Sequence, residues 1–171
     1  MDAETIVDTR ALRDAFGCFA TGITVVTTLS ENGTPVGITA NSFTSVSLDP
    51  PLLLWCLDRR STTYGVFSSC KIFVITVLDA GATAVASRFA MKDGHTVGDQ
   101  ESVPTEMGPP TFPGALAVFE CDMQARYDGG DHVVMLGLVR RFKSCAEAQR
   151  NAHGPLLYYR GRYRALASPT G

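Results

Sequence analysis

The sequence predicts a mainly β fold, an antiparallel barrel with helices packed on its outside. About seven segments have the length and the apolar or β-branched content of strands. Helical patterns are few and do not alternate regularly with these segments, as they would in a doubly wound sheet. The Gly-x-Gly-x-x-Gly fingerprint and the Gly-x-x-x-x-Gly-Lys loop are both absent. A nucleotide cofactor would therefore have to bind without a glycine-rich loop.

The composition is that of an ordinary globular protein, and we expect a single domain over residues 1–171. Hydrophobic residues make up 45% of the chain and charged residues 19%, with a formal net charge of -2. This balance offers no basic surface, so nucleic acid is not an expected partner. No apolar run approaches the roughly 20 residues of a membrane span, and the acidic N-terminus does not fit a secretory signal. We expect no membrane association.

The cysteines and histidines do not form a recognisable metal or disulfide pattern. The five cysteines are odd in number and contain no Cys-x-x-Cys pair. They are expected to be reduced, mostly buried thiols of a cytoplasmic protein. His95, His132 and His153 share no ligand spacing with the cysteines, so no metal site is predicted.

The first predicted element is a helix over Arg10–Ala20, which Asp8 or Thr9 can cap. Its apolar stripe consists of Leu12, Phe16 and Phe19. The strands that follow are expected at Ile23–Leu29, Pro35–Ala40, Leu52–Leu57, Lys71–Leu78, Ala115–Tyr127, His132–Arg141 and Leu156–Leu166. A short helix fits within Arg59–Ser69 and an alanine-rich one over Ala80–Ala90, whereas Met91–Pro113 is typical of a functional loop or lid.

A polar stretch between two predicted strands, Thr39–Pro51, is the most informative part of the chain. Hydroxyl and amide side chains crowd it, and they could project into a cleft and hold a phosphate and a heteroaromatic ring. Equally, Thr39–Ser47 could be a strand whose hydroxyl groups face water.

Two further polar segments allow alternative interpretations. Asp58–Thr63 offers guanidinium and hydroxyl groups at a possible helix start, which suits an anion, but it also fits a capped surface turn. His132 follows the turn Asp128–Asp131 at the start of a strand. It could be a functional group at the barrel rim or a turn histidine with no role.

Several motifs together resemble the short-chain flavin reductases, the reductase components of two-component flavin-dependent monooxygenases. The matching segments occur in the family's order over nearly the whole chain. They are Gly22–Thr28, Val36–Pro51, Cys56–Thr62, Phe73–Leu78, Arg88–Ala90, Gly114–Ala117, Glu120–Cys121, Gly130–His132 and Pro155–Gly161.

The resemblance implies a Greek-key antiparallel split β-barrel, the flavin reductase-like FMN-binding split barrel, that works as a homodimer. It implies an NAD(P)H:flavin oxidoreductase that reduces free FAD or FMN and passes reduced flavin to a partner monooxygenase. NADH is favoured over NADPH as the hydride donor. A non-catalytic flavin- or haem-binding split-barrel protein is the alternative, and a barrel enzyme that oxidises its own organic substrate with bound flavin is a third possibility.

The resemblance also implies roles for individual residues. Hydride transfer between two bound rings depends on positioning, so no catalytic acid or base is assigned and His132 is the nearest candidate. The residues expected to bind flavin are Thr39, Ala40, Asn41, Ser42, Ser45, Cys56, Leu57, Asp58, Ser61, Thr62, Phe89, Ala90 and Lys92. His132, Tyr159 and Arg160 are expected to bind NADH. Relatives often carry an aromatic-rich stretch where this chain has Met91–Pro109, so no lid contact is inferred there.

Overall fold

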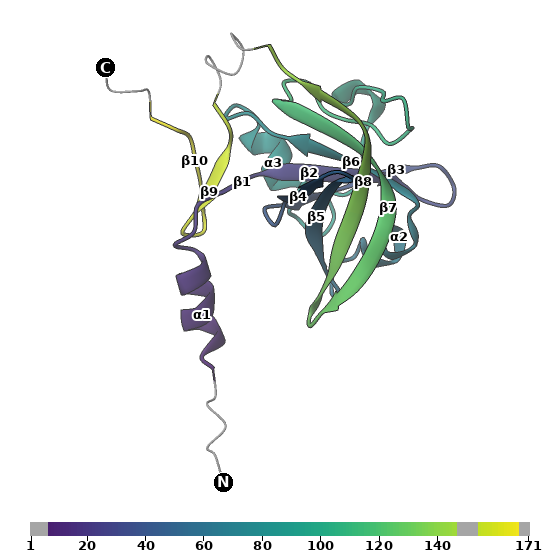
Figure 1. Cartoon of the computed structure of the whole chain (residues 1–171). Coiled ribbons are helices and arrows are strands. Elements are labelled where there is room, and N and C mark those ends of the chain that lie inside the picture. Colours follow the sequence, from purple (N-terminus) through teal and green to yellow (C-terminus); the bar gives the residue numbers. More distant parts are fainter. Residues whose placement is uncertain (1–6, 147–153, 168–171) are drawn as a thin grey trace.

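A computed structural model of the chain describes residues 7–146 and 154–167, so His153 lies outside the described residues. The fold is an antiparallel β-barrel with short helices at its periphery (Figure 1). The elements are α1 (Thr9–Phe16), β1 (Thr21–Gly22), β2 (Thr24–Leu29), β3 (Pro35–Ala40), β4 (Thr44–Leu48), β5 (Pro51–Asp58), α2 (Tyr64–Ser69), β6 (Ile72–Val77), α3 (Thr83–Phe89), η1 (Asp99–Glu101), β7 (Ala117–Gly129), β8 (His132–Ser144), β9 (Leu157–Tyr159) and β10 (Arg162–Arg164).

The strands form two sheets, one of seven strands and one of three. The larger sheet has the order β3-β2-β6-β7-β8-β5-β4, and all its pairs are antiparallel. The smaller sheet has the order β1-β9-β10 and continues from the N-terminal side of β2. The predicted mainly β, antiparallel fold is therefore confirmed.

Two buried clusters stabilise this arrangement. One fills the barrel around Trp55, whose ring packs edge-on against Phe67 and Phe73. The other lies beneath α3, where Phe89 packs against Phe112 with 5.1 Å between ring centroids. Each aromatic ring removes a large apolar area from water, so these clusters fix α2 and α3 on the barrel.

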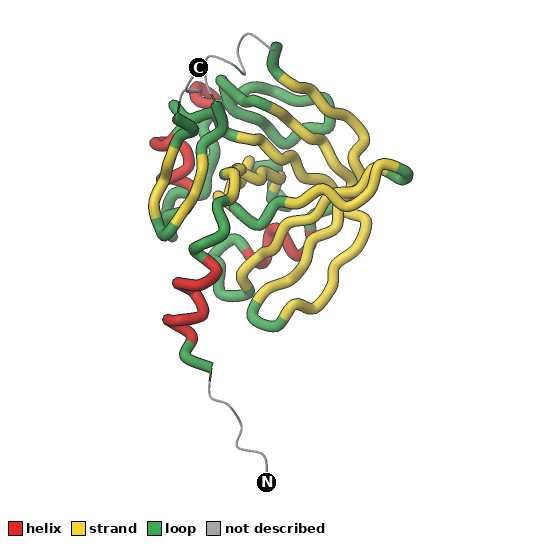
Figure 2. Tube along the Cα trace, turned by 60° about the vertical axis from the view of Figure 1, so that its left-hand side comes forward, coloured by secondary structure: helices red, strands yellow, loops and turns green. Residues whose placement is uncertain are grey.

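Three sequence predictions differ from the structure. The first helix ends at Phe16 rather than Ala20, and none of its residues is buried, so its apolar stripe does not pack on the barrel. Asp8 is its N-cap and accepts the backbone N–H groups of Arg10 and Ala11. Figures 1 and 2 show α1 extending away from the barrel.

The second difference is a strand in the polar stretch. Thr44–Leu48 forms β4 at one edge of the larger sheet, and most of its residues are exposed, so this part of the stretch fits the water-facing alternative. The third is the last predicted strand, which is a hairpin of β9 and β10. Arg160 and Gly161 have φ of 48° and 73° and form its turn, because positive φ at two consecutive residues reverses the chain sharply. Among the described residues no helix is long and apolar enough to cross a membrane.

Candidate functional site

A cavity of about 490 Å³ opens between β3, the end of β5 and the C-terminal end of α3; we call it the α3 cavity. The residues that line it come from segments far apart in the sequence. They are Ile38, Thr39, Asp58, Arg60, Ser61, Thr62, Phe89, Ala90, Met91, Lys92 and His95. Seven of the thirteen residues expected to bind flavin are in this set, and the fold therefore brings them together.

Close packing of α3 on β3 forms one wall of the α3 cavity. The Thr39 hydroxyl donates a hydrogen bond to the carbonyl of Ala86, at 2.7 Å, and ties β3 to the helix. A Cβ added at Gly37 would lie 3.0 Å from the Phe89 ring, so glycine permits this approach. Phe89 itself is almost fully buried, which makes it a rigid floor rather than a mobile cover.

The segment after β5 forms the opposite wall. The Asp58 carboxylate accepts a hydrogen bond from the backbone N–H of Arg60 at 2.8 Å and contacts the Arg60 guanidinium at 3.2 Å. The Arg60 side chain and then its backbone N–H lower the pKa of Asp58 from its ordinary value, so the carboxylate stays ionised. The Thr62 hydroxyl donates to the carbonyl of Lys92 at 3.1 Å and links this wall to the loop after α3.

The Gly-Asp-His turn lies next to this wall, because β5 pairs with β8. His132 is directly opposite Asp58 in the register, and the Arg59 guanidinium donates to the carbonyl of Gly130 and to Asp128. His132 contacts the Asp131 carboxylate through Nδ1 at 2.7 Å. Both arginines of the predicted anion-binding segment are thus placed: Arg59 holds the turn, and Arg60 lines the α3 cavity.

The other six predicted flavin residues lie between the end of β3 and the end of β5. The Ser42 hydroxyl accepts the backbone N–H of Cys56 at 2.8 Å, and burial raises the pKa of the Cys56 thiol. Ser45 is exposed on β4. The Leu57 side chain is fully buried in the barrel core, so the expectation that Leu57 walls the flavin can hold only for its backbone.

Asn41 and Arg160 line a different cavity, of about 730 Å³, between the end of α1 and the β9–β10 turn; we call it the α1 cavity. The backbone N–H of Arg160 donates to the carbonyl of Gly17 at 3.0 Å, and its guanidinium lies 5.5 Å from the centre of the Tyr159 ring. Ala40, also expected at the flavin, is buried in the barrel core at the end of β3. The three expected NADH residues are therefore divided between β8 and the β9–β10 hairpin.

The residues expected to bind flavin or NADH did not include Ile38, Arg60, Met91 and His95, which line the α3 cavity. His95 lies in the segment that departs from the family pattern, so no motif pointed to it. Arg60 stands inside a matching motif beside Ser61, and its position after a strand was the available signal. No group of three or more His, Cys, Asp or Glu side chains suited to a metal occurs in the part of the chain that the structure describes.

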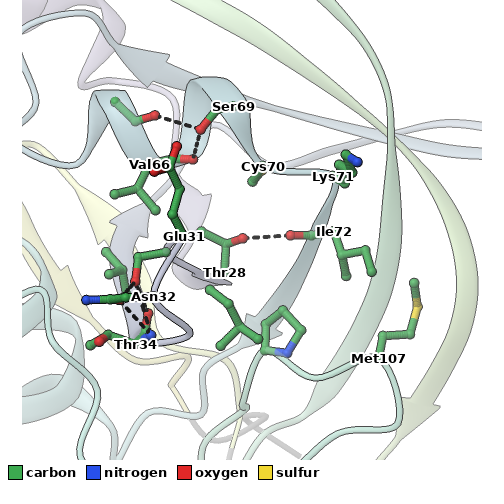
Figure 3. Close-up of a pocket in the computed structure, with 15 residues that line it drawn as sticks. Thr28, Glu31, Asn32, Thr34, Val66, Ser69, Cys70, Lys71, Ile72 and Met107 are labelled. Carbon is green, nitrogen blue, oxygen red and sulfur yellow. Dashed lines mark hydrogen bonds between the residues drawn. The ribbon is translucent and has the colours of Figure 1, made fainter.

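A larger cavity, of about 790 Å³, lies on α2 and the β2–β3 turn and contains none of the predicted site residues (Figure 3). Several of its hydroxyl groups hydrogen-bond within the protein. Thr28 donates to the carbonyl of Ile72 at 2.7 Å, and Ser69 donates to that of Gly65 at 3.0 Å. The α3 cavity gathers seven of the predicted flavin residues, so it is the better candidate site.

The structure is thus an antiparallel barrel with a cavity lined by hydroxyl and basic side chains, and the sequence has no glycine-rich nucleotide-binding loop. Residues 16–167 match the family model described as flavin reductase like domain. A probable flavin reductase of Rhizobium meliloti is 47% identical over 152 residues, which cover 84% of this chain and 46% of that protein. The reductase component of a flavin-dependent trigonelline monooxygenase of Acinetobacter baylyi is 41% identical over 154 residues, which cover 90% of this chain and 48% of that protein.

A solved structure shows the same fold. The NADH:FAD oxidoreductase SgcE6 of Streptomyces globisporus, in complex with NAD and FAD fragments, aligns with a TM-score of 0.84 and 36% identity. The alignment covers 99% of this chain and 100% of that chain. This chain belongs to the flavin reductase like domain family. It spans about half the length of the two curated relatives named above.

Proposed function

We propose that the protein is an NAD(P)H:flavin oxidoreductase that reduces free FAD or FMN with NADH and supplies reduced flavin to a partner monooxygenase. The convergence of seven expected flavin residues on the α3 cavity carries this proposal. The names of the relatives support it, because they include an NADH:FAD oxidoreductase and the reductase component of a monooxygenase. A cytoplasmic location is part of the proposal, and it fits the absence of disulfides among the described cysteines.

The side chains of the α3 cavity suit a flavin. Ser61, Thr62 and Lys92 offer hydroxyl groups and a positive charge to a phosphate, while Ala90 is small enough to leave a ring face open. The flavin, when bound, supplies the electron acceptor for hydride from the nicotinamide. The protein's contribution is to hold the two rings in contact and to exclude water, which requires rigid walls rather than a titrating acid or base. The Thr39–Ala86 and Thr62–Lys92 hydrogen bonds provide that rigidity.

We also propose that the protein acts as a homodimer. An eight-residue helix with no buried residue is not expected to be stable alone in water, so α1 needs a partner surface. A second copy packed on α1 would close the α1 cavity. It would also bring Tyr159 and Arg160 of one chain toward the flavin of the other.

The test is to mix the purified protein with NADH and follow the NADH absorbance with no flavin, with FMN and with FAD, and to repeat the series with NADPH. We expect the nicotinamide to be oxidised only when flavin is added, and we expect NADH to be oxidised faster than NADPH. The protein should purify with little bound flavin, because a reductase that delivers reduced flavin must release it.

The alternatives predict different results in the same assay. A non-catalytic flavin- or haem-binding protein would bind its ligand and oxidise no NADH with either flavin. An enzyme with resident flavin and its own organic substrate would purify yellow and would not need added flavin. Either result would contradict the proposed function.

A further inference from the structure

The loop after α3 is fastened to β3 and holds His95 in the wall of the α3 cavity. The backbone N–H of Gly37 donates to the carbonyl of His95 at 2.8 Å, and the N–H of Val97 donates to that of Pro35 at 3.0 Å. The Arg88 guanidinium donates to the carbonyl of Thr96 and pairs with Glu101. The position of His95 is therefore fixed by contacts on both sides of it.

The hydrogen bond of the His95 ring determines what its other nitrogen can do. Nδ1 lies 2.9 Å from the carbonyl oxygen of Gly37, which can only accept, so Nδ1 carries a proton. In the neutral ring Nε2 is then a bare acceptor, and it becomes a donor only when the ring is protonated. A phosphate oxygen accepts hydrogen bonds, so it can bond Nε2 only in the imidazolium form.

The charges around His95 favour an anion. Lys92, from the same loop, lines the cavity and has no salt-bridge partner among residues 7–146 and 154–167. Across the cavity, Asp58 is held by Arg60, so these two charges largely offset each other. His132, opposite Asp58 on β8, is the other titratable ring near this wall. The remaining charge that faces a ligand is therefore positive.

We propose that His95 is a proton-dependent ligand for the phosphate of the flavin, so that flavin binding tightens as the pH falls. This inference rests on the proposed function, because it places the flavin in the α3 cavity. FAD suits the test, since its pyrophosphate does not titrate between about pH 5.5 and 8, unlike the monophosphate of FMN, whose second pKa is about 6. Histidine rings in general titrate at about pH 6.5, inside this range.

The experiment measures the Kd for FAD by fluorescence titration at about pH 5.5 and 8 in the full-length protein. The wild type should bind FAD about 10-fold more tightly at the lower pH. His95→Gln should bind with equal, weak affinity at both pH values. His95→Lys, which keeps the positive charge, should bind tightly at both. Circular dichroism confirms that each variant is folded.

Two controls separate the effect of His95 on the phosphate from effects of the flavin ring and of His132. Riboflavin, which has no phosphate, should show no pH dependence, and His132→Gln should retain the pH dependence for FAD. The proposal is overturned if the wild type binds FAD equally at both pH values, if His95→Gln keeps the dependence, or if His132→Gln abolishes it. A protein that binds FAD in this pH-dependent way but oxidises no NADH would support the ligand role and overturn the proposed reductase function.

Discussion

His132 occupies the first position of β8, and its ring is oriented by an acidic neighbour. Nδ1–H donates to the Asp131 carboxylate at 2.7 Å, and this bond keeps the pKa of Asp131 below its ordinary value. The imidazole is about half exposed and therefore keeps Nε2 available to a ligand at the rim. This arrangement suits a residue that contacts a nicotinamide but does not hold the flavin.

His132→Ala should therefore raise the KM for NADH while leaving flavin binding nearly unchanged. We expect about a 5- to 10-fold increase, which is the size of one lost hydrogen bond to a bound ligand. Steady-state kinetics with saturating FAD give KM, and fluorescence titration gives the Kd for FAD. Asp131→Asn keeps the His132 ring but weakens the hydrogen bond that orients it, so this variant should show a smaller increase in the KM for NADH. Unchanged NADH kinetics in His132→Ala would contradict the assignment.

The loop after α3 passes so close to the helix that only glycine fits at position 94. A Cβ built on Gly94 would lie 2.1 Å from the backbone carbonyl oxygen of Arg88. A backbone atom cannot move aside as a flexible side chain can, so Gly94→Ala must displace the loop and with it His95.

We expect Gly94→Ala to weaken FAD binding by about 10-fold at pH 6, which is the loss of one charge-assisted hydrogen bond. Gly65→Ala is the matched control. Its Cβ meets nothing within 4 Å, and Ala in α2 should stabilise the helix by up to about 1 kcal/mol. Thermal unfolding and FAD titration on both variants check the prediction, which fails if Gly94→Ala binds FAD like the wild type.

Strand β7 carries a thiol whose burial makes the fold sensitive to alkaline pH. Burial first, and then the charges of Asp122 and Glu120, raise the pKa of Cys121 from 9.0 to about 12. The native thiol stays neutral, whereas an unfolded thiol ionises near pH 9. Its contribution to stability is therefore complete below about pH 9 and is lost as the pH rises toward 12.

Cys121→Ala should consequently lose less stability than the wild type as the pH rises through this range, even if the variant is less stable at pH 8. Urea unfolding at pH 8, 9.5 and 10.5 gives the slope of the unfolding free energy against pH for each protein. The control is Cys18→Ala, because Cys18 is exposed. Equal slopes for Cys121→Ala and wild type would contradict the prediction.

Across the whole molecule, the sequence predicted the strands whose bounds follow from the pattern of neighbouring residues. The strand over Pro35–Ala40 has the predicted bounds. The Leu156–Leu166 hairpin was missed because Arg160, a poor residue for positive φ, occupies its turn. The place of His95 depends on long-range pairing between its loop and β3, which a local pattern does not contain. The motifs predicted seven of the residues that line the α3 cavity. They could not predict lining residues that lie outside the motifs, such as His95.

The exposed stripe of α1 leads to the last prediction, which concerns assembly. Phe16, the last residue of α1, and Phe19, shortly after it, are 69% and 77% exposed and line the α1 cavity. Burying such side chains stabilises an association by about 1.5–3 kcal/mol each. The proposed homodimer should therefore have a mass twice the 18.3 kDa of one chain, and the double change Phe16→Ser and Phe19→Ser should give a monomer.

Size-exclusion chromatography with light scattering measures the mass, and the NADH assay follows in the same fractions. The monomer should lose most of its NADH oxidation while it still binds FAD in the α3 cavity, because only the nicotinamide side needs the second chain. Phe142→Ser is the matched control, since Phe142 is 71% exposed on β8. A wild type that is monomeric and active would show that one chain alone assembles the NADH site. A double variant that stays dimeric would show that the dimer does not depend on Phe16 and Phe19.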